Sequence, residues 1–166
     1  MYYFGYCTYL LEAELRKYLP EAKAVTRATA ANHQIQFRAA GAREDRGWCH
    51  LADRGPVYGK SAQGIVFEVD DTRNKDEFDD FDIVYLTVNG EDGKAYDCFT
   101  YVLSNPGIRM RPPRYYWERV PNGLAEQDFP AEYRAEVQAI FDEAAECPDY
   151  DRPMPAGAPG KDASTR

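Results

Sequence analysis

Two apolar stretches joined by a short polar segment constrain the fold of this 166-residue chain more than any other feature. The first is Ile83-Val84-Tyr85-Leu86-Thr87-Val88, and the second covers residues 95–103. β-Branched and aromatic side chains favour strands, and the segment Asn89-Gly90-Glu91-Asp92-Gly93 between them is rich in residues that form turns. The sequence therefore predicts a β-hairpin here.

Further strands and a few helices are predicted around this hairpin. Residues 2–6 form an aromatic strand that runs directly into a helical pattern, for which Thr8 is the expected N-cap and Pro20 the stop. A short helix is predicted near residues 115–120, and a last helix begins at about Pro130. Alternating or apolar sequence predicts strands at residues 25–31, 34–39, 48–52 and 64–69.

This order of elements predicts an α+β protein with a mixed, strongly curved or barrel-like β-sheet and a few packed helices. The chain length suits one domain, which we place at residues 1–146. Residues 147–166 have no periodicity and much Pro and Gly, so we expect a flexible tail there.

Composition and charge narrow the classes of partner. The chain has thirteen Tyr and 44% hydrophobic residues, enough for a core in which the Tyr hydroxyls need polar partners. Its net charge of −8 argues against nonspecific nucleic-acid binding. One local basic cluster, residues 109–119, is interpreted either as a solvated loop or as a lip that attracts an anionic substrate.

The cysteines and the lengths of the apolar stretches indicate the cellular compartment of the protein. No stretch is long enough to span a bilayer, and the N-terminus lacks a signal-peptide pattern, so we expect a cytoplasmic protein that contacts no membrane. The four cysteines, at positions 7, 49, 98 and 147, show no metal-ligand spacing, and we expect them to be reduced. With only His33 and His50 available as imidazole ligands, no metal site is expected.

Several motifs resemble those of one family. Tyr3-Phe4-Gly5-Tyr6-Cys7-Thr8-Tyr9-Leu10 is similar to a Tyr-Phe-Ala/Gly-Tyr-Gly-Ser/Thr-Asn-Leu signature, with Cys7 in place of Gly and Tyr9 in place of Asn. Gly64-Ile65-Val66-Phe67 resembles a Val-x-Gly-Val strand, and Phe129-Pro130-Ala131-Glu132-Tyr133 a Leu-Pro-x-x-Tyr helix start. Over about residues 2–140 the chain resembles the γ-glutamylcyclotransferase-like family, including its AIG2-like plant relatives.

The acidic motif of this family also has a counterpart. The segment Lys75-Asp76-Glu77-Phe78-Asp79-Asp80 resembles Leu-Asp-x-aromatic-Glu-Gly, which aligns Asp79 with the catalytic Glu and Asp80 with Gly. Asp is one methylene shorter than Glu, so the backbone must shift to keep the carboxylate within hydrogen-bond reach of the substrate. Glu77 is the alternative acid if the register slips by two residues.

The resemblance implies a reaction as well as a fold. The α-amine of a γ-glutamyl amine or amide attacks its own γ-carbonyl, which releases an amine and closes 5-oxoproline. This chemistry implies that the substrate is bound in a folded conformation and that a carboxylate carries a proton from the attacking amine to the leaving amine. No cofactor is implied. The implied substrate-binding residues are those of the first strand-to-helix bend together with one tyrosine of the later short helix, namely Tyr6, Cys7, Thr8, Tyr9, Leu10 and Tyr116. A small-molecule γ-glutamyl substrate is the expected partner, and the chain is expected to be a monomer or homodimer.

Other interpretations stay open from the residues alone. Asp79 lies in an acidic stretch of a kind that usually forms a solvated loop, and Tyr9 and Tyr116 are equally compatible with a place in the core. Cys7, at a helix start, is a candidate nucleophile if His33 or His50 lies beside it, and otherwise a buried inert thiol. The altered signature also fits a protein that binds a small molecule or a partner in the same cavity without turnover.

Overall fold

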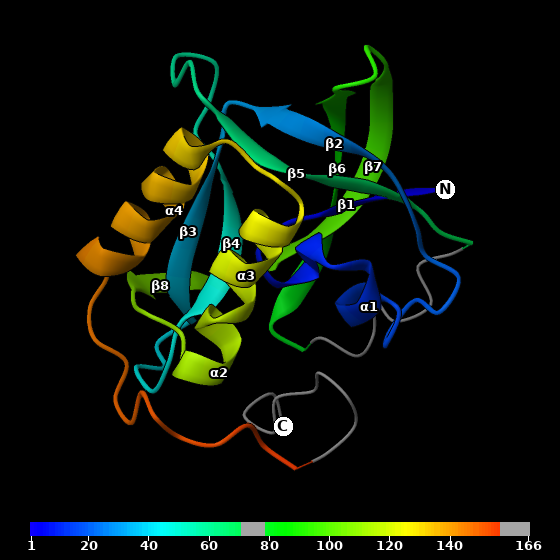
Figure 1. Ribbon diagram of the computed structural model, residues 1–166. Helices are drawn as coiled ribbons and strands as arrows, with labels where there is room; N and C mark the ends of the chain where they lie inside the picture. Colours follow the sequence, from blue (N-terminus) through cyan, green and yellow to red (C-terminus); the bar gives the residue numbers. More distant parts are fainter. Residues whose placement is uncertain (71–78, 157–166) are drawn as a thin grey trace.

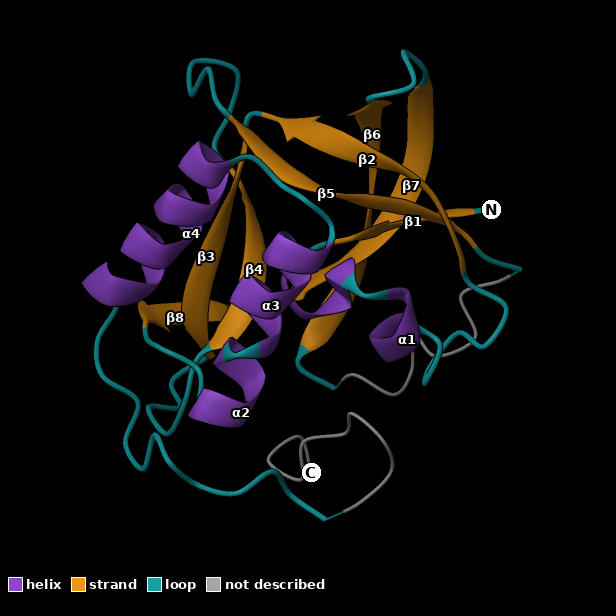
Figure 2. Cartoon of the chain, in the orientation of Figure 1, coloured by secondary structure: helices purple, strands orange, loops and turns teal. Residues whose placement is uncertain are grey.

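A closed five-stranded barrel and a separate three-stranded sheet make up the architecture of the computed structural model, which describes residues 1–70 and 79–156 (Figure 1). The helices lie against these two sheets, which gives the α+β arrangement predicted from the sequence (Figure 2). In chain order the elements are β1 (Tyr2–Gly5), the 3₁₀ helix η1 (Cys7–Leu10), α1 (Glu12–Leu15), β2 (Lys23–Ala31), β3 (His33–Ala40), β4 (Trp48–Asp53), β5 (Ser61–Glu68), β6 (Phe81–Gly90), β7 (Ala95–Leu103), β8 (Pro106–Arg109), α2 (Arg114–Trp117), α3 (Arg119–Glu126) and α4 (Ala131–Glu143).

The barrel has the strand order β1-β5-β2-β6-β7, and β1 closes it by pairing in parallel with β7. The β6–β7 hairpin is the longest ladder, running from Phe81 opposite Leu103 to Asn89 opposite Ala95, as the sequence predicted. Phe4 of β1 and Val66 of β5 lie in the core with no exposed surface. The barrel therefore supplies a rigid base for the segments at its two ends.

The three-stranded sheet has the order β4-β3-β8 and is covered by α4 (Figure 1). Phe37 of β3 packs edge-on against Trp117 and Phe141, whose own rings stack with centroids 3.9 Å apart. Strand β8 lies in a segment for which the sequence predicted no strand. It pairs with β3 at Arg38 opposite Arg109, which is a long-range contact that no local pattern announces.

Two predicted helices differ from those in the structure. The first was expected to run from Thr8 to Pro20, but it is divided into η1 and the four-residue α1, because Leu11 is extended with φ −94° and ψ 123°. Thr8 lies inside η1 and caps neither helix. The predicted short helix near residues 115–120 is two helices, α2 and α3.

The described part of the expected tail, residues 147–156, contacts the domain. Cys147 is buried, and Arg152 donates hydrogen bonds to the carbonyls of Asp45 and Pro148, both at 2.7 Å. Asp151 pairs with Arg114 at 2.6 Å. Among the described residues no helix is long and apolar enough to cross a bilayer.

Tyr133 of α4 closes a gap in the barrel's hydrogen bonding. Strand β1 pairs with β5 only at Ile65 and beyond, so the backbone of Gln63 faces no strand on that side. The Tyr133 hydroxyl takes that place, accepting a hydrogen bond from Gln63 N at 2.9 Å and donating one to Gln63 O at 3.3 Å. The helix is thereby joined to the barrel by polar as well as apolar contacts.

We expect Tyr133→Phe to lower the free energy of unfolding by about 1–3 kcal/mol, because it leaves two backbone groups without a partner. Tyr85→Phe is the matched control, since the Tyr85 side chain is 78% exposed and its loss of a hydroxyl should change stability by less than about 0.5 kcal/mol. Urea denaturation of both variants measures the difference. Equal stability of the two variants would show that the hydroxyl of Tyr133 contributes nothing.

Candidate functional site

The first bend and the described end of the acidic segment, Asp79 and Asp80, lie at the same end of the barrel. Strand β1 ends at Gly5, and the next residue, Tyr6, donates its hydroxyl to Tyr101 O of β7 at 2.5 Å. Two residues further along β7, Leu103 pairs with Phe81, the first residue of β6. Asp79 therefore precedes β6 at the end of the barrel that also carries the bend. Its side chain is exposed to solvent, and Glu77 lies outside the described residues.

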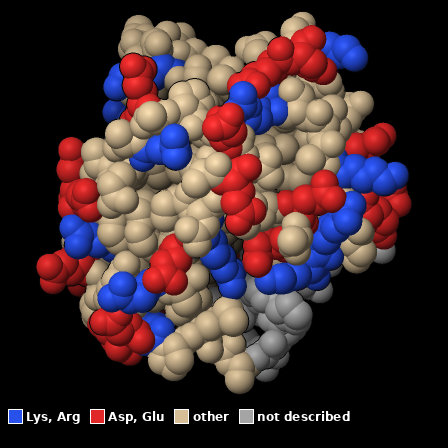
Figure 3. All heavy atoms as spheres, in the orientation of Figure 1, with Lys and Arg blue, Asp and Glu red and all other residues tan. Residues whose placement is uncertain are grey.

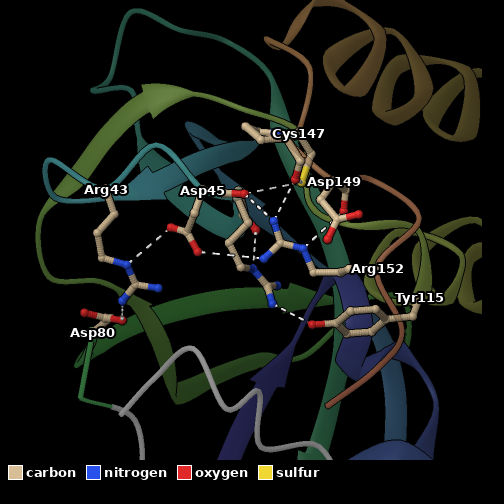
Figure 4. Close-up of polar contacts among 10 residues, drawn as sticks. Arg43, Asp45, Asp80, Tyr115, Cys147, Asp149 and Arg152 are labelled. Atoms are coloured by element: carbon tan, nitrogen blue, oxygen red, sulfur yellow. Dashed lines mark hydrogen bonds and ion pairs between the residues drawn. The ribbon is translucent and has the colours of Figure 1, made fainter.

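Asp80, next to the candidate acid, is held by the loop between β3 and β4. Arg43 of this loop pairs with Asp80 at 2.9 Å, and Ser104 N donates to Asp80 O at 2.9 Å (Figure 4). Arg43 also approaches Asp45 at 3.5 Å, and Asp45 in turn contacts Arg152. This chain of contacts fixes the backbone at the start of β6, and with it the position from which Asp79 projects.

The bend itself is closed by a disulfide. Cys7 of η1 is bonded to Cys49 of β4, with the two Cα atoms 6.4 Å apart, within the range that a disulfide spans. This corrects two predictions from the sequence, because Cys7 is neither a nucleophilic thiol nor a reduced inert one. The remaining cysteines, Cys98 and Cys147, are free and buried.

Close packing holds the bend in one conformation. Cys7 has φ 54°, in the left-handed region that disfavours residues with a Cβ, and the disulfide restrains it there. Gly5 leaves no room for a side chain, since a Cβ on it would lie 2.5 Å from Tyr9 O. On the other side, a Cβ on Gly123 of α3 would lie 3.0 Å from the Leu10 Cβ. The bend is therefore closely packed against β5, β4 and α3.

The side chains of the bend point into the protein. Tyr6, Cys7, Thr8 and Leu10 are all buried, and Tyr9 is partly buried. The Tyr9 ring packs edge-on against Tyr18 with centroids 5.6 Å apart. Of the predicted substrate-binding residues in this bend, the structure brings all five together, yet it presents their backbone rather than most of their side chains.

Tyr116 joins the bend to β4. Its hydroxyl accepts a hydrogen bond from Cys49 N at 3.0 Å and shares another with the Thr8 side chain. Burial raises the pKa of Tyr116, and the hydrogen bond from Cys49 opposes that rise. Burial raises the pKa of Tyr6 in the same way, opposed by a backbone hydrogen bond with Leu51. Both hydroxyls are thus neutral at physiological pH and serve as hydrogen-bonding groups rather than bases.

Arg46 is a buried charge that the sequence analysis missed. Its side chain has no exposed surface, and its guanidinium lies 3.4 Å from the centroid of the Trp48 ring. It also donates to the Tyr115 hydroxyl at 2.8 Å. Burial lowers the pKa of Arg46 to about 10, so the group stays charged at neutral pH. A polar loop sequence carries no signal for such burial.

The basic cluster of residues 109–119 is largely used within the protein. Arg111 donates to the carbonyls of Phe141 and Asp142 at the end of α4, at 3.0 and 2.5 Å. Arg114 pairs with Asp151, and Arg119 approaches Glu14 at 3.8 Å. On the face seen in Figure 3, acidic and basic side chains alternate. These contacts favour a structural role for Arg111, Arg114 and Arg119 over an anion-attracting lip.

The described residues form no metal site, and a small hollow among them does not involve the bend. No group of three or more potential ligands that could hold a metal occurs within residues 1–70 and 79–156. A small hollow on the three-stranded sheet, to which no bend residue contributes, is lined by Gln34, Gln36, Phe37, Arg109, Ile140 and Glu143.

Comparison with known proteins supports the fold. No family model and no curated protein matches the sequence. Among solved structures, a γ-glutamyl cyclotransferase matches with a TM-score of 0.73 at 19% identity over 94% of each chain. The uncharacterized protein loc79017 from Homo sapiens matches with a TM-score of 0.71 at 19% identity over 93% of each chain. YkqA from Bacillus subtilis gives 0.70 at 18% identity, covering 88% of this chain and 55% of that one. The chain thus has the γ-glutamylcyclotransferase-like fold.

His50 provides a pH-dependent test of the contact between the two sheets. Its Nδ1 accepts a hydrogen bond from Leu103 N of β7 at 3.2 Å, which requires the neutral imidazole. Burial, together with the nearby charge of Arg38, lowers the pKa of His50 from 6.5 to about 4. As pH falls below 6.5 the unfolded chain gains a proton at this residue that the folded chain does not, so stability declines until about pH 4.

We expect His50→Asn to remove this pH dependence of the folding stability, because Asn can accept the same hydrogen bond without titrating. Between pH 6.5 and 4 the wild type should lose up to about 3 kcal/mol more stability than the variant. Urea denaturation across this range measures the difference, with His33→Asn as the control because His33 is more exposed. Parallel pH profiles for the wild type and His50→Asn would contradict the assignment.

Proposed function

We propose that this chain cyclises a γ-glutamyl amine or amide, releasing 5-oxoproline and an amine. The observation that carries the proposal is the position of Asp79, an exposed carboxylate at the barrel end that also carries the bend of residues 6–10. The likeness to a solved γ-glutamyl cyclotransferase supports it at the level of the fold.

In the proposed reaction Asp79 removes one proton from the substrate's α-ammonium. The free amine attacks the γ-carbonyl carbon, Asp79 returns its proton to the leaving nitrogen as the C–N bond breaks, and the attacking nitrogen loses its second proton to water, which leaves the neutral lactam and the free amine. Protein groups need only hold the amine and the carbonyl in contact, since the chain that links them makes the attack intramolecular. No cofactor or metal takes part in this scheme.

The bend would bind the substrate mainly through its backbone. The first N–H groups of η1 have no acceptor within the helix, and Tyr9 N already donates to Tyr6 O at 3.1 Å. Cys7 and Thr8 would thus offer backbone donors, whereas the Thr8 and Tyr116 side chains would keep the bend in position through their mutual hydrogen bond. The replacement of a Gly by Cys7 matters less in this scheme, because the side chain points toward β4 and not into solvent.

The proposal includes a cytoplasmic location and a monomer or homodimer. The disulfide is unusual for such a location, because cytosolic disulfides are generally transient or redox-active.

A second candidate is a protein that binds a small molecule with this fold and does not turn it over. The observation that favours it is the packing of the bend, where Cys7 is tied to Cys49 and Tyr9 lies against Tyr3 and Tyr18. These side chains occupy space that an enzyme could leave to substrate.

Asp79→Asn tests the catalytic proposal. Because the amide cannot accept the ammonium proton, we expect kcat for 5-oxoproline release from γ-glutamyl amines to fall by about 100-fold or more. Asp82→Asn is the matched control, an exposed acid three residues away on β6. Unchanged turnover in Asp79→Asn would reject Asp79 as the base.

The binding candidate makes a different prediction for the wild type. If the chain only binds its ligand, γ-glutamyl amines or 5-oxoproline should raise the melting temperature of the protein, and a chromatographic assay should detect no 5-oxoproline release. Turnover by the wild type would exclude it.

A further inference from the structure

The Cys7–Cys49 disulfide is the only cross-link between side chains of the two sheets' segments within the described residues. Cys7 follows β1 of the barrel, and Cys49 belongs to β4 of the three-stranded sheet, 42 residues away in the chain. The bend also contacts β4 without a covalent bond, through the hydrogen bond between the Tyr6 hydroxyl and the Leu51 backbone. Breaking the disulfide would therefore change how the bend is held without removing its remaining contacts.

Once the disulfide is broken, the backbone of the bend is expected to change conformation. Residue 7 adopts φ 54°, which L-residues with a Cβ disfavour, and the disulfide ties its side chain to β4 in that conformation. In the reduced protein nothing covalent opposes relaxation toward negative φ. Such a rotation would displace the N–H of Thr8, which lies at the start of the bend.

We infer that Cys7–Cys49 is a thiol–disulfide exchange site that sets the conformation of the bend. The co-reactant is a dithiol, and a thiolate of it attacks one sulfur of the disulfide to give a mixed disulfide and one protein thiol. The second thiol of the reductant then displaces the other sulfur. The reductant becomes a disulfide, and the chain gains two thiols, two electrons and two protons.

The other cysteines are poorly suited to compete in this exchange. Burial and Asp97 raise the pKa of Cys98 to about 12, and burial raises the pKa of Cys147 as well. Since the thiolate is the attacking species, neither provides an internal nucleophile at neutral pH. The sulfurs of Cys7 and Cys49 belong to residues only 5% and 4% exposed, so an external dithiol must wait for the bend to open.

This inference rests on the geometry of the disulfide, and only its effect on turnover rests on the proposed function. In a reducing compartment the bend would be released, and in an oxidising one it would be fixed. The same chain would therefore present two forms of the candidate site according to the redox state around it.

The test equilibrates the full chain in a series of oxidised and reduced dithiothreitol buffers without denaturant. Alkylation followed by peptide mass spectrometry should show Cys7 and Cys49 becoming reactive together, while Cys98 and Cys147 stay protected. Amide hydrogen exchange in residues 6–10 should then accelerate by about tenfold or more, with the β6–β7 hairpin unchanged. Reduction that occurs only with global unfolding, or a bend whose exchange rate does not change, would overturn the inference.

Two variants separate redox control from loss of folding. Cys49→Ser should show the fast exchange of the reduced bend in every buffer, whereas Cys98→Ala should follow the wild type. If Cys49→Ser does not fold, the wild-type titration still decides. If the redox state also changes the rate of 5-oxoproline release, the disulfide is linked to turnover. If hydrogen exchange changes with redox state but the protein shows no turnover at all, the redox inference stands and the proposed function is contradicted.

Discussion

The inner edge of β4 is the constraint on which the candidate site depends. This strand pairs with β3 on one side only, and its other edge is turned into the protein. Buried backbone N–H groups must find acceptors, and here a side chain supplies one, since Cys49 N donates to the Tyr116 hydroxyl. Leu51 hydrogen-bonds with Tyr6 in the same way. Tyrosine hydroxyls from helix α2 and from the bend after β1 thus complete the edge of β4, where another fold would place a neighbouring strand.

This arrangement gives a structural role to three of the thirteen tyrosines and keeps their hydroxyls neutral. Tyr6, Tyr116 and Tyr133 each complete the hydrogen bonding of a strand edge, and burial raises the pKa of each hydroxyl. With these groups committed to the scaffold, the bend offers a ligand mainly its backbone. In the proposed reaction, proton transfer falls to Asp79, an exposed carboxylate at the barrel end that carries the bend.

Local patterns predicted the elements that are formed by local rules. The β6–β7 hairpin follows from alternating apolar residues and a turn-rich connection, and α4 follows from its apolar face. Strand β8 could not be predicted in this way, because it begins at a proline and exists only through its pairing with distant β3. Residues 147–156 show the same difficulty, since Arg152 reaches Asp45 without any periodicity to reveal it.

The sequence motifs predicted a site formed by the bend and Asp79, which stays a prediction, and they did not reveal the disulfide or the buried Arg46. The resemblance of the signature segment and the acidic motif placed the bend and Asp79 together, and the strand order puts them at one barrel end. No spacing rule pairs two cysteines 42 residues apart, so the disulfide at Cys7 could not be foreseen. The burial of Arg46 against Trp48 was equally invisible, because it depends on how a polar loop folds back onto β4.

We propose that a small γ-glutamyl ligand binds where the bend meets the start of β6. Amide hydrogen exchange of the oxidised wild type, with and without saturating 5-oxoproline, tests this location most directly. Binding at this place should slow exchange in residues 6–10 and 79–81 and leave exchange elsewhere unchanged. Protection confined to the hollow lined by Gln34, Arg109 and Glu143, or no protection at all, would contradict it.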